Sequence, residues 1–224
     1  MANIAGQEPY LEGTGQMVIK ILIALLLFAA PCFAGTAQIR NVVGMAIQNS
    51  GGSIVDDFSS ACTTTGCTNY TAITSYGMVV SSGTAKGNTN FQTAIVYHET
   101  PTGSDDHYVQ YSRDNAYGGG VLRCNGTTGY LIKASNATTV YLYPFNGSTV
   151  GAYVGGGAWT GLTLTSSSVI KLTVTGNTFE LFIDDVSQGT KSDATYSTGQ
   201  YVGMHWTRGS GDNPAIDNFS GGAL

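Results

Sequence analysis

The chain has 224 residues, of which 31 are glycine and 10% are charged, and its formal net charge is −5 at pH 7. Its nine basic residues are scattered singly, so it lacks the basic stripe that neutralises several phosphates, and we expect no nucleic-acid partner. Charged residues usually make up about 25% of a soluble domain. A chain this poor in charge and rich in glycine is typical of short strands joined by tight turns.

Residues 1–34 have the pattern of a secretory signal peptide. Lys20 precedes the apolar run 21–30, and small residues follow as far as Ala34, in the order of the three regions of such a signal. The run is too short for a membrane span, which needs about 20 residues. We therefore expect cleavage after Ala34 and a secreted protein, extracellular or periplasmic, with no stable membrane span. Because the stretch before Met17 is polar, either translation starts at Met17 or the segment is an uncleaved anchor.

The remaining chain is expected to be a flexible lead-in, 35–52, followed by one domain, 53–224. No stretch of ten or more residues there has helical apolar spacing. Alternation and turn residues predict short strands throughout the domain. In chain order the expected strands are 54–58, 72–74, 78–81, 91–97, 107–112, 121–124, 127–132, 139–145, 148–153, 169–175, 178–183, 201–206 and 215–219.

Three of these strand pairs are predicted hairpins, because Asn125-Gly126, Asn146-Gly147 and Gly176-Asn177 tolerate the positive φ values of two-residue turns. The hairpin 169–183 alternates most clearly. Its expected inward set is Ile170, Leu172, Val174, Phe179, Leu181 and Ile183. Its expected outward set is Lys171, Thr173, Glu180 and Phe182.

The cysteines fit an oxidising compartment. Cys62 and Cys67 flank a short Thr/Gly loop that can close as a disulfide. A metal site is the weaker alternative, because no His or further Cys lies near them in the sequence. Cys124 falls in a strand-like segment, where it is either a small buried side chain or a thiol that pairs between molecules.

Four segments together resemble a known family. They are Val-Asp-Asp-Phe at 55–58, the hairpin and turn 170–186, the stretch 192–200 with Tyr-Val-Gly-Met at 201–204, and Ile-Asp-Asn-Phe-Ser-Gly-Gly at 216–222. Their order resembles that of the laminin-G-like, concanavalin A-like jelly-roll modules of bacterial and viral secreted proteins, which include lectins and glucanases. The resemblance covers residues 53–222.

The resemblance implies an antiparallel jelly-roll sandwich of two sheets, with the first and last strands paired. That pairing would bring Asp57 and Asp217 together on the rim of the sandwich. Two close carboxylates call for a cation or for hydrogen-bond donors, so a structural Ca²⁺ is expected there, with turn capping by the two carboxylates as the alternative. The sequence departs from the family at Asp184-Asp185, where Asp-Gly is more usual; we expect a looser turn.

The same resemblance implies a carbohydrate ligand, because sugar binding needs flat apolar rings beside planar polar groups. Trp159, on a Gly-rich loop, and Trp206, near Arg208, are the first candidates. Tyr111 and Arg113 share one face of a predicted strand and complete the set. The resulting hypothesis is a secreted, non-enzymatic module that binds a polysaccharide or glycan.

Two other classes remain open. A glycoside hydrolase needs two carboxyl groups across the scissile bond, and after residue 34 the chain offers only two glutamates, Glu99 and Glu180, outside the family's catalytic motifs. A structural or adhesive surface protein would use the same sandwich for protein contacts. The sequence specifies neither the sugar nor the oligomeric state.

Overall fold

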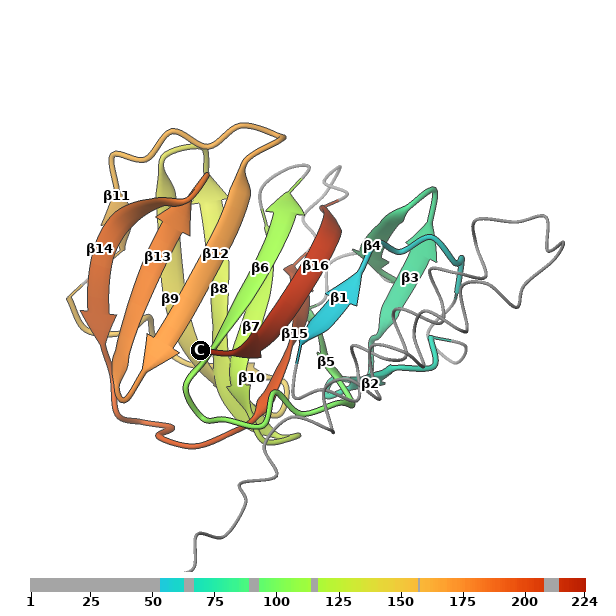
Figure 1. The fold of residues 1–224 in the computed structure, drawn as a ribbon, viewed down its shortest axis with the longest axis horizontal. Helices are drawn as coiled ribbons and strands as arrows, with labels where there is room; N and C mark the ends of the chain where they lie inside the picture. Colours follow the sequence, from blue (N-terminus) through green and yellow to red (C-terminus); the bar gives the residue numbers. More distant parts are fainter. Residues whose placement is uncertain (1–52, 63–66, 89–92, 114–116, 157, 208–213) are drawn as a thin grey trace, which may run out of the picture. The chain divides into compact units, whose positions relative to one another are not determined.

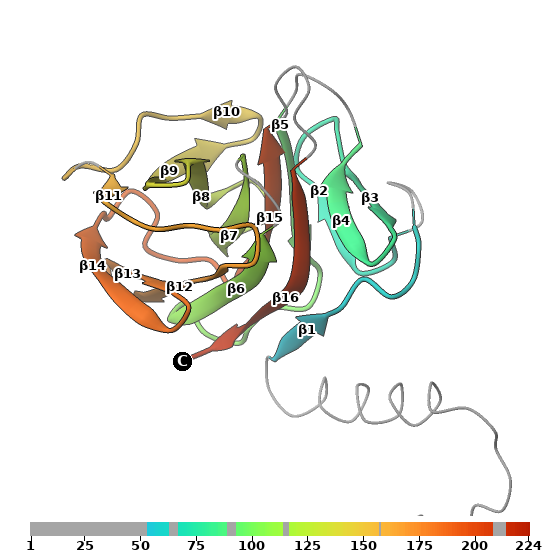
Figure 2. The ribbon, with the colours of Figure 1, turned by 90° about the horizontal axis from the view of Figure 1, so that it is seen from above.

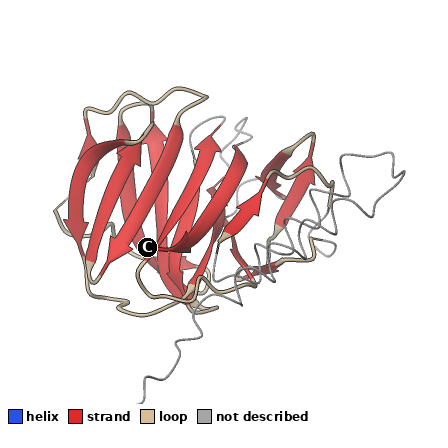
Figure 3. Ribbon diagram, viewed as in Figure 1, coloured by secondary structure: helices blue, strands red, loops and turns tan. Residues whose placement is uncertain are grey.

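The structure, a computed structural model, describes residues 53–62, 67–88, 93–113, 117–156, 158–207 and 214–224. These residues belong to one compact unit, Met45–Leu224. Every regular element among them is a β-strand (Figure 3), and this described part holds no helix that could cross a membrane. The predicted all-β class is confirmed. The predicted signal peptide and lead-in lie outside the described residues.

Sheet A is the front layer of Figure 1. Across this sheet the strands are β14 (Val186–Ser192), β13 (Thr178–Ile183), β12 (Val169–Thr175), β6 (His107–Arg113), β16 (Ala215–Ala223), β4 (Thr84–Gly87) and β3 (Met78–Ser81). An eighth strand, β1 (Ile54–Asp56), pairs antiparallel with β16. The first and last strands are therefore neighbours, as the family resemblance implied.

Sheet B lies behind sheet A, and the two layers are separated clearly in Figure 2. Its strands, in spatial order, are β10 (Thr149–Val150), β9 (Thr139–Asn146), β8 (Thr128–Asn136), β7 (Gly118–Cys124), β15 (Tyr201–Thr207), β5 (Thr93–His98) and β2 (Tyr70–Ala72). The short strand β11 (Trp159–Thr160) pairs with β9. Both sheets are antiparallel throughout, so the structure is a two-sheet antiparallel sandwich.

The main core fills the space between the sheets. On β6 and β12 buried and half-buried or exposed residues alternate strictly, because successive side chains point to opposite faces of a sheet. The expected inward set of the β12–β13 hairpin is buried and the expected outward set is half-buried. The prediction for this hairpin is confirmed.

Most predicted strands are present, but β4, β11 and β14 were not expected. The predicted strand 72–74 lies two residues earlier, as β2, and the strand expected at 148–153 is only two residues long. The expected loose turn at Asp184-Asp185 is wrong. Ile183 pairs directly with Val186, and the two aspartates form a tight turn with φ of 50° and 64°.

The disulfide between Cys62 and Cys67 is present, with a Cα–Cα distance of 5.1 Å, and that prediction is confirmed. Cys62 also forms a bridge with Val80, which extends the edge of sheet A beyond β3. Cys124 is a buried free thiol, and burial raises its pKa to about 11. It therefore behaves as a small apolar side chain.

Candidate functional site

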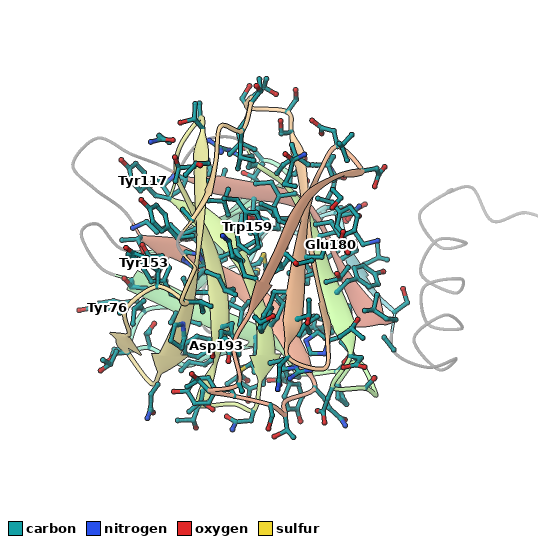
Figure 4. All side chains as sticks on the ribbon, turned by 90° about the vertical axis from the view of Figure 1, so that its left-hand side faces the viewer. Tyr76, Tyr117, Tyr153, Trp159, Glu180 and Asp193 are labelled. Atoms are coloured by element: carbon teal, nitrogen blue, oxygen red, sulfur yellow. A yellow bond between two sulfur atoms is a disulfide. The ribbon has the colours of Figure 1, made fainter. Side chains whose placement is uncertain are left out.

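Trp159 closes an edge of the sandwich. The residue lies on β11 and pairs with Val140 of sheet B, while its indole Nε1 donates to the Gly189 carbonyl of β14 in sheet A at 2.9 Å. Figure 4 places the side chain between the two layers. Lys191 Nζ lies 5.7 Å from the ring centroid, and only 4% of the residue is exposed. Trp159 therefore presents almost no surface to a ligand.

Trp206, Tyr111 and Arg113 are also buried, on the inward faces of β15 and β6. Tyr111 and Arg113 are close enough to interact electrostatically, and burial lowers the pKa of the Arg113 guanidinium. All three side chains are part of the interior, so direct contact with a ligand does not fit their positions. Arg208 lies outside the described residues and stays a prediction.

The carboxylates expected at a calcium site each accept a hydrogen bond from a backbone N–H of their own segment. Asp57 Oδ1 accepts a hydrogen bond from the Ser59 backbone N–H at 3.1 Å, and Asp217 Oδ1 accepts one from the Asn218 N–H at 2.7 Å. Within the described ranges, no group of three or more His, Cys, Asp or Glu side chains could hold a metal ion. Ca²⁺ takes six to eight oxygen ligands, and the side chains present do not form that set.

The two glutamates considered for hydrolysis do not face one another. Glu180 lies on the outward face of β13 in sheet A, and its Oε1 accepts from the Ser187 hydroxyl at 2.6 Å. Glu99 follows β5 of sheet B and accepts from the Thr71 hydroxyl at 2.6 Å. They belong to different sheets, and Glu180 points away from sheet B (Figure 4).

The outward face of sheet B has a different character. It carries tyrosine side chains that are half-buried or exposed, on β5, β9 and β15 and on the segments beside β7 and β10. These are Tyr97, Tyr117, Tyr141, Tyr143, Tyr153 and Tyr201. We call this surface the tyrosine face. In Figure 4, Tyr117 and Tyr153 both lie on the side of sheet B, opposite Glu180.

Three of its rings form a close group. The Tyr153 ring lies 5.3 Å from that of Tyr141 and 6.4 Å from that of Tyr143, centroid to centroid, and the last two rings are 5.8 Å apart. Tyr141 and Tyr143 are adjacent outward positions of β9. Tyr153 is 52% exposed and reaches the pair from the segment that follows β10. Aromatic rings at these separations stabilise one another's positions.

An apolar layer supports these rings from below. Its buried members, on the outward faces of four strands, are Ile95, Val121, Cys124, Leu131 and Phe145. The strand register continues from Tyr143 through Leu131, Val121 and Gly203 to Tyr97. This row crosses five strands, about 19 Å at the usual strand spacing. A Cβ on Gly203 would lie 2.0 Å from the Val96 carbonyl oxygen, so bare backbone is required there.

Lys133 supplies a positive charge on this surface. It lies on β8 directly opposite Tyr141, and its Nζ is 5.3 Å from the Tyr117 ring centroid. Burial lowers the pKa of its ammonium and raises the pKa of the Tyr143 phenol. The tyrosine face therefore combines flat rings, phenol hydroxyl groups and the ammonium of Lys133.

Sequence reasoning missed this site for a definite reason. The sequence favours two tryptophans beside Gly-rich segments together with Tyr111 and Arg113, and none of these four residues lies on the tyrosine face. The usable signal was Tyr-Leu-Tyr at 141–143 followed by Tyr153, because alternation places Tyr141 and Tyr143 on one face. Which face is outward depends on how the sheets pack, and that information lies in contacts distant in sequence.

No protein-family model matches the sequence, and no curated protein is similar to it in sequence. Solved structures do resemble it. The carbohydrate-binding module CBM66 from Bacillus subtilis matches with a TM-score of 0.52 at 17% identity, covering 69% of this chain and 96% of that one. A β-1,3-1,4-glucanase (lichenase) derived from a mouse hindgut metagenome has a TM-score of 0.51 at 10% identity, with 77% and 100% covered.

The exoplasmic/lumenal domain of VIP36, in its Ca²⁺/Man3GlcNAc-bound form, is similar with a TM-score of 0.52 at 11% identity, covering 77% of this chain and 88% of that one. These proteins include a carbohydrate-binding module, a glucanase and a domain bound to Man3GlcNAc, and at such low identity the likeness is one of fold. The expectation drawn from the four sequence segments is confirmed at that level. The described part of this chain has the concanavalin A-like jelly-roll fold of lectins and glucanases.

Proposed function

We propose that the protein is a secreted, non-enzymatic module that binds a polysaccharide or glycan on the tyrosine face. The observation that carries this proposal is the group formed by Tyr141, Tyr143 and Tyr153 above an apolar layer on an outward sheet face. A contiguous aromatic patch on an outer surface marks an interaction site. Secretion is supported by the Cys62–Cys67 disulfide, which suits an oxidising compartment.

The chemistry of the tyrosine face matches that of a sugar. A pyranose has an apolar face of C–H groups and a rim of hydroxyls, so it stacks on a ring while its hydroxyls exchange hydrogen bonds. Tyrosine supplies both the ring and a hydroxyl and loses little conformational entropy on binding. Since Tyr153 is more than half exposed while Tyr141 and Tyr143 support it, the stacking surface is held in place before the ligand arrives.

Binding without hydrolysis is supported by the carboxylates. A glycosidase places two carboxyl groups roughly 5–10 Å apart on either side of the bond. Glu180 and Glu99 belong to opposite sheets, and each accepts a hydrogen bond from a neighbouring hydroxyl. Glu180 projects from the outward face of sheet A, whereas Glu99 follows Tyr97 at the border of the tyrosine face and accepts from Thr71, so a ligand on that face would not lie between the two carboxyl groups.

The test is a glycan array followed by titration of the best ligand with variants. We expect Tyr153→Ala and Tyr141→Ala each to weaken binding about tenfold, because truncation of a central aromatic contact typically costs 1 kcal/mol or more. Tyr108→Ala is the matched control. Tyr108 is a half-buried tyrosine with a lysine, Lys171, 5.1 Å from its ring, but it lies on the outward face of sheet A. We expect that variant to bind normally.

The same titration in EDTA tests the expected calcium. Since Asp57 and Asp217 each accept a backbone N–H bond within their own segment, we expect chelation to leave the affinity unchanged. A blank array with folded protein would overturn the proposal. If Tyr153→Ala then altered the oligomeric state in light scattering, the tyrosine face would be a protein contact of the structural or adhesive kind.

A further inference from the structure

The charges of the described residues are distributed unevenly between the two sheets. Sheet A strands contain Asp56, Glu180 and Asp217, whereas none of the strands of sheet B contains an Asp or a Glu. The chain as a whole carries a net charge of −5. The strands under the tyrosine face are thus free of acidic residues in an otherwise acidic protein.

Two basic side chains belong to the strands of sheet B, and they differ in their partners. Arg123 is buried and forms a salt bridge with Asp106, with 3.2 Å between Nη2 and Oδ1. Lys133 forms no salt bridge or hydrogen bond within the described part of the chain; its ammonium contacts the Tyr117 ring. Lys133 therefore has its positive charge available among the tyrosines.

We propose that the glycan bound on the tyrosine face is acidic, and that Lys133 pairs with a carboxylate or sulfate group of the polymer. This inference rests on the proposed function and specifies its ligand class. It follows from the unpaired ammonium directly opposite Tyr141, and from the absence of Asp and Glu in the strands that surround it. An anion placed there meets the Lys133 ammonium, while Glu99, which follows β5 on the same side of sheet B, lies three strands away from β8.

Partial burial makes this pairing favourable for binding. Lys133 is half-buried, and the loss of water already lowers its ammonium pKa. The free protein has thus borne part of the desolvation cost of the cation before a ligand arrives. A charge-assisted hydrogen bond in such a setting is stronger than one between neutral groups. A neutral sugar would stack on the rings and leave the ammonium without an anionic partner.

The experiment compares matched polymers on the full-length protein by affinity electrophoresis and calorimetry. Polygalacturonate supplies carboxylates, its fully methyl-esterified form has the same backbone without charge, and dextran sulfate against dextran tests sulfate in the same way. We expect one charged polymer to bind at least tenfold more tightly than its uncharged counterpart. The preferred pair identifies whether the anion is a carboxylate or a sulfate.

Variants then assign the preference to Lys133. We expect Lys133→Gln to remove most of the tenfold preference for charge, and Lys133→Arg to retain it, since the positive charge remains. Lys171→Gln is the matched control, because Lys171 also lies over a tyrosine, Tyr108, but on sheet A. Circular dichroism and the melting temperature establish that each variant is folded.

The outcomes separate the two proposals. Equal binding of charged and uncharged polymers, unaffected by Lys133→Gln, would overturn the acidic ligand and leave the proposed carbohydrate function standing. If every polymer and the glycan array were negative with folded protein, both proposals would fall.

Discussion

Two buried arginines differ in how their guanidinium groups are satisfied. Arg123 Nε donates to the Asp105 carbonyl, Nη1 to the Ser197 carbonyl and Nη2 to Asp106 Oδ1, at 2.7–3.2 Å. Arg113 is also buried, but its Nε and Nη1 have no acceptor among the described residues. A buried donor without an acceptor costs about 1–3 kcal/mol, so the two residues contribute to stability with opposite signs.

We therefore expect opposite results from the same substitution. Arg123→Met removes three hydrogen bonds of a charged group and should lower the unfolding free energy by about 3 kcal/mol or more. Arg113→Met replaces a buried cation that has two donor nitrogens without an acceptor among the described residues by an apolar chain of similar length, and it should raise the melting temperature by a few degrees. Thermal unfolding of both variants checks this, and destabilisation by Arg113→Met would mean that its guanidinium does have an acceptor in the folded protein.

At the level of elements, the turn between β13 and β14 stores strain at a defined position. Asp184 and Asp185 both have positive φ, which is unfavourable for residues with a Cβ. Asp184 offsets this cost because its Oδ1 accepts from the Val169 backbone N–H at 2.8 Å. Asp185 makes no comparable side-chain hydrogen bond to any residue that the structure describes.

We expect glycine substitutions at these two positions to change the unfolding free energy in opposite directions. Asp185→Gly relieves the strained φ, and we expect it to raise the unfolding free energy by about 0.5 kcal/mol after the entropy of the unfolded chain is counted. Asp184→Gly gains the same relief but loses the hydrogen bond to Val169, so we expect it to lower stability by a similar amount. Chemical denaturation measures both. Equal shifts in the two variants would contradict the role given to the Asp184 carboxylate.

Among the strands that the sequence predicts correctly, β6 and β12 alternate between buried and half-buried or exposed residues, which is the pattern that local sequence shows most clearly. β14 was missed because it is an edge strand of exposed and half-buried residues without alternation, and its pairing with β13 forms only in the folded sheet. β11 was missed because a strand of two residues is too short to show an alternating pattern of buried and exposed residues. Pairing of β1 with β16 was predicted through the family resemblance, since strand order across a sheet leaves no local pattern in the sequence.

The site was harder to predict than the fold. Trp159 was favoured because glycines flank it, yet it joins the two sheets through the Gly189 carbonyl. Tyr141 and Tyr143 are not among the residues that the sequence favours, yet they face outward with Tyr153. In each case the position of the side chain depends on which face of its strand is covered by another part of the protein. Periodicity identifies a shared face but does not tell whether that face meets the other sheet or solvent.

At the scale of the whole molecule, three buried histidines make the unfolding free energy depend on pH. His98, His107 and His205 are all buried, and burial lowers the pKa of each imidazole below its usual value. The effect is largest at His205, whose pKa falls to about 4; the nearby Lys133 charge adds to the shift, while the hydrogen bond to the Ile132 carbonyl opposes it. The folded protein therefore keeps these rings neutral where the unfolded chain protonates them.

The direction of the pH dependence follows from this difference. Between pH 6.5 and about 4 the unfolded chain binds more protons than the folded protein, so the unfolding free energy must fall as the pH is lowered through that window. For His205 alone, a shift from 6.5 to about 4 corresponds to roughly 3 kcal/mol. We expect His205→Gln, which keeps a donor for the Ile132 carbonyl, to flatten the dependence by up to one proton. Guanidinium unfolding of both proteins at pH 7 and pH 4.5 tests this. A glutamine cannot take up the proton that His205 is expected to bind on unfolding. If the unfolding free energy fell by the same amount between pH 7 and pH 4.5 in both proteins, acid would destabilise the fold through other groups.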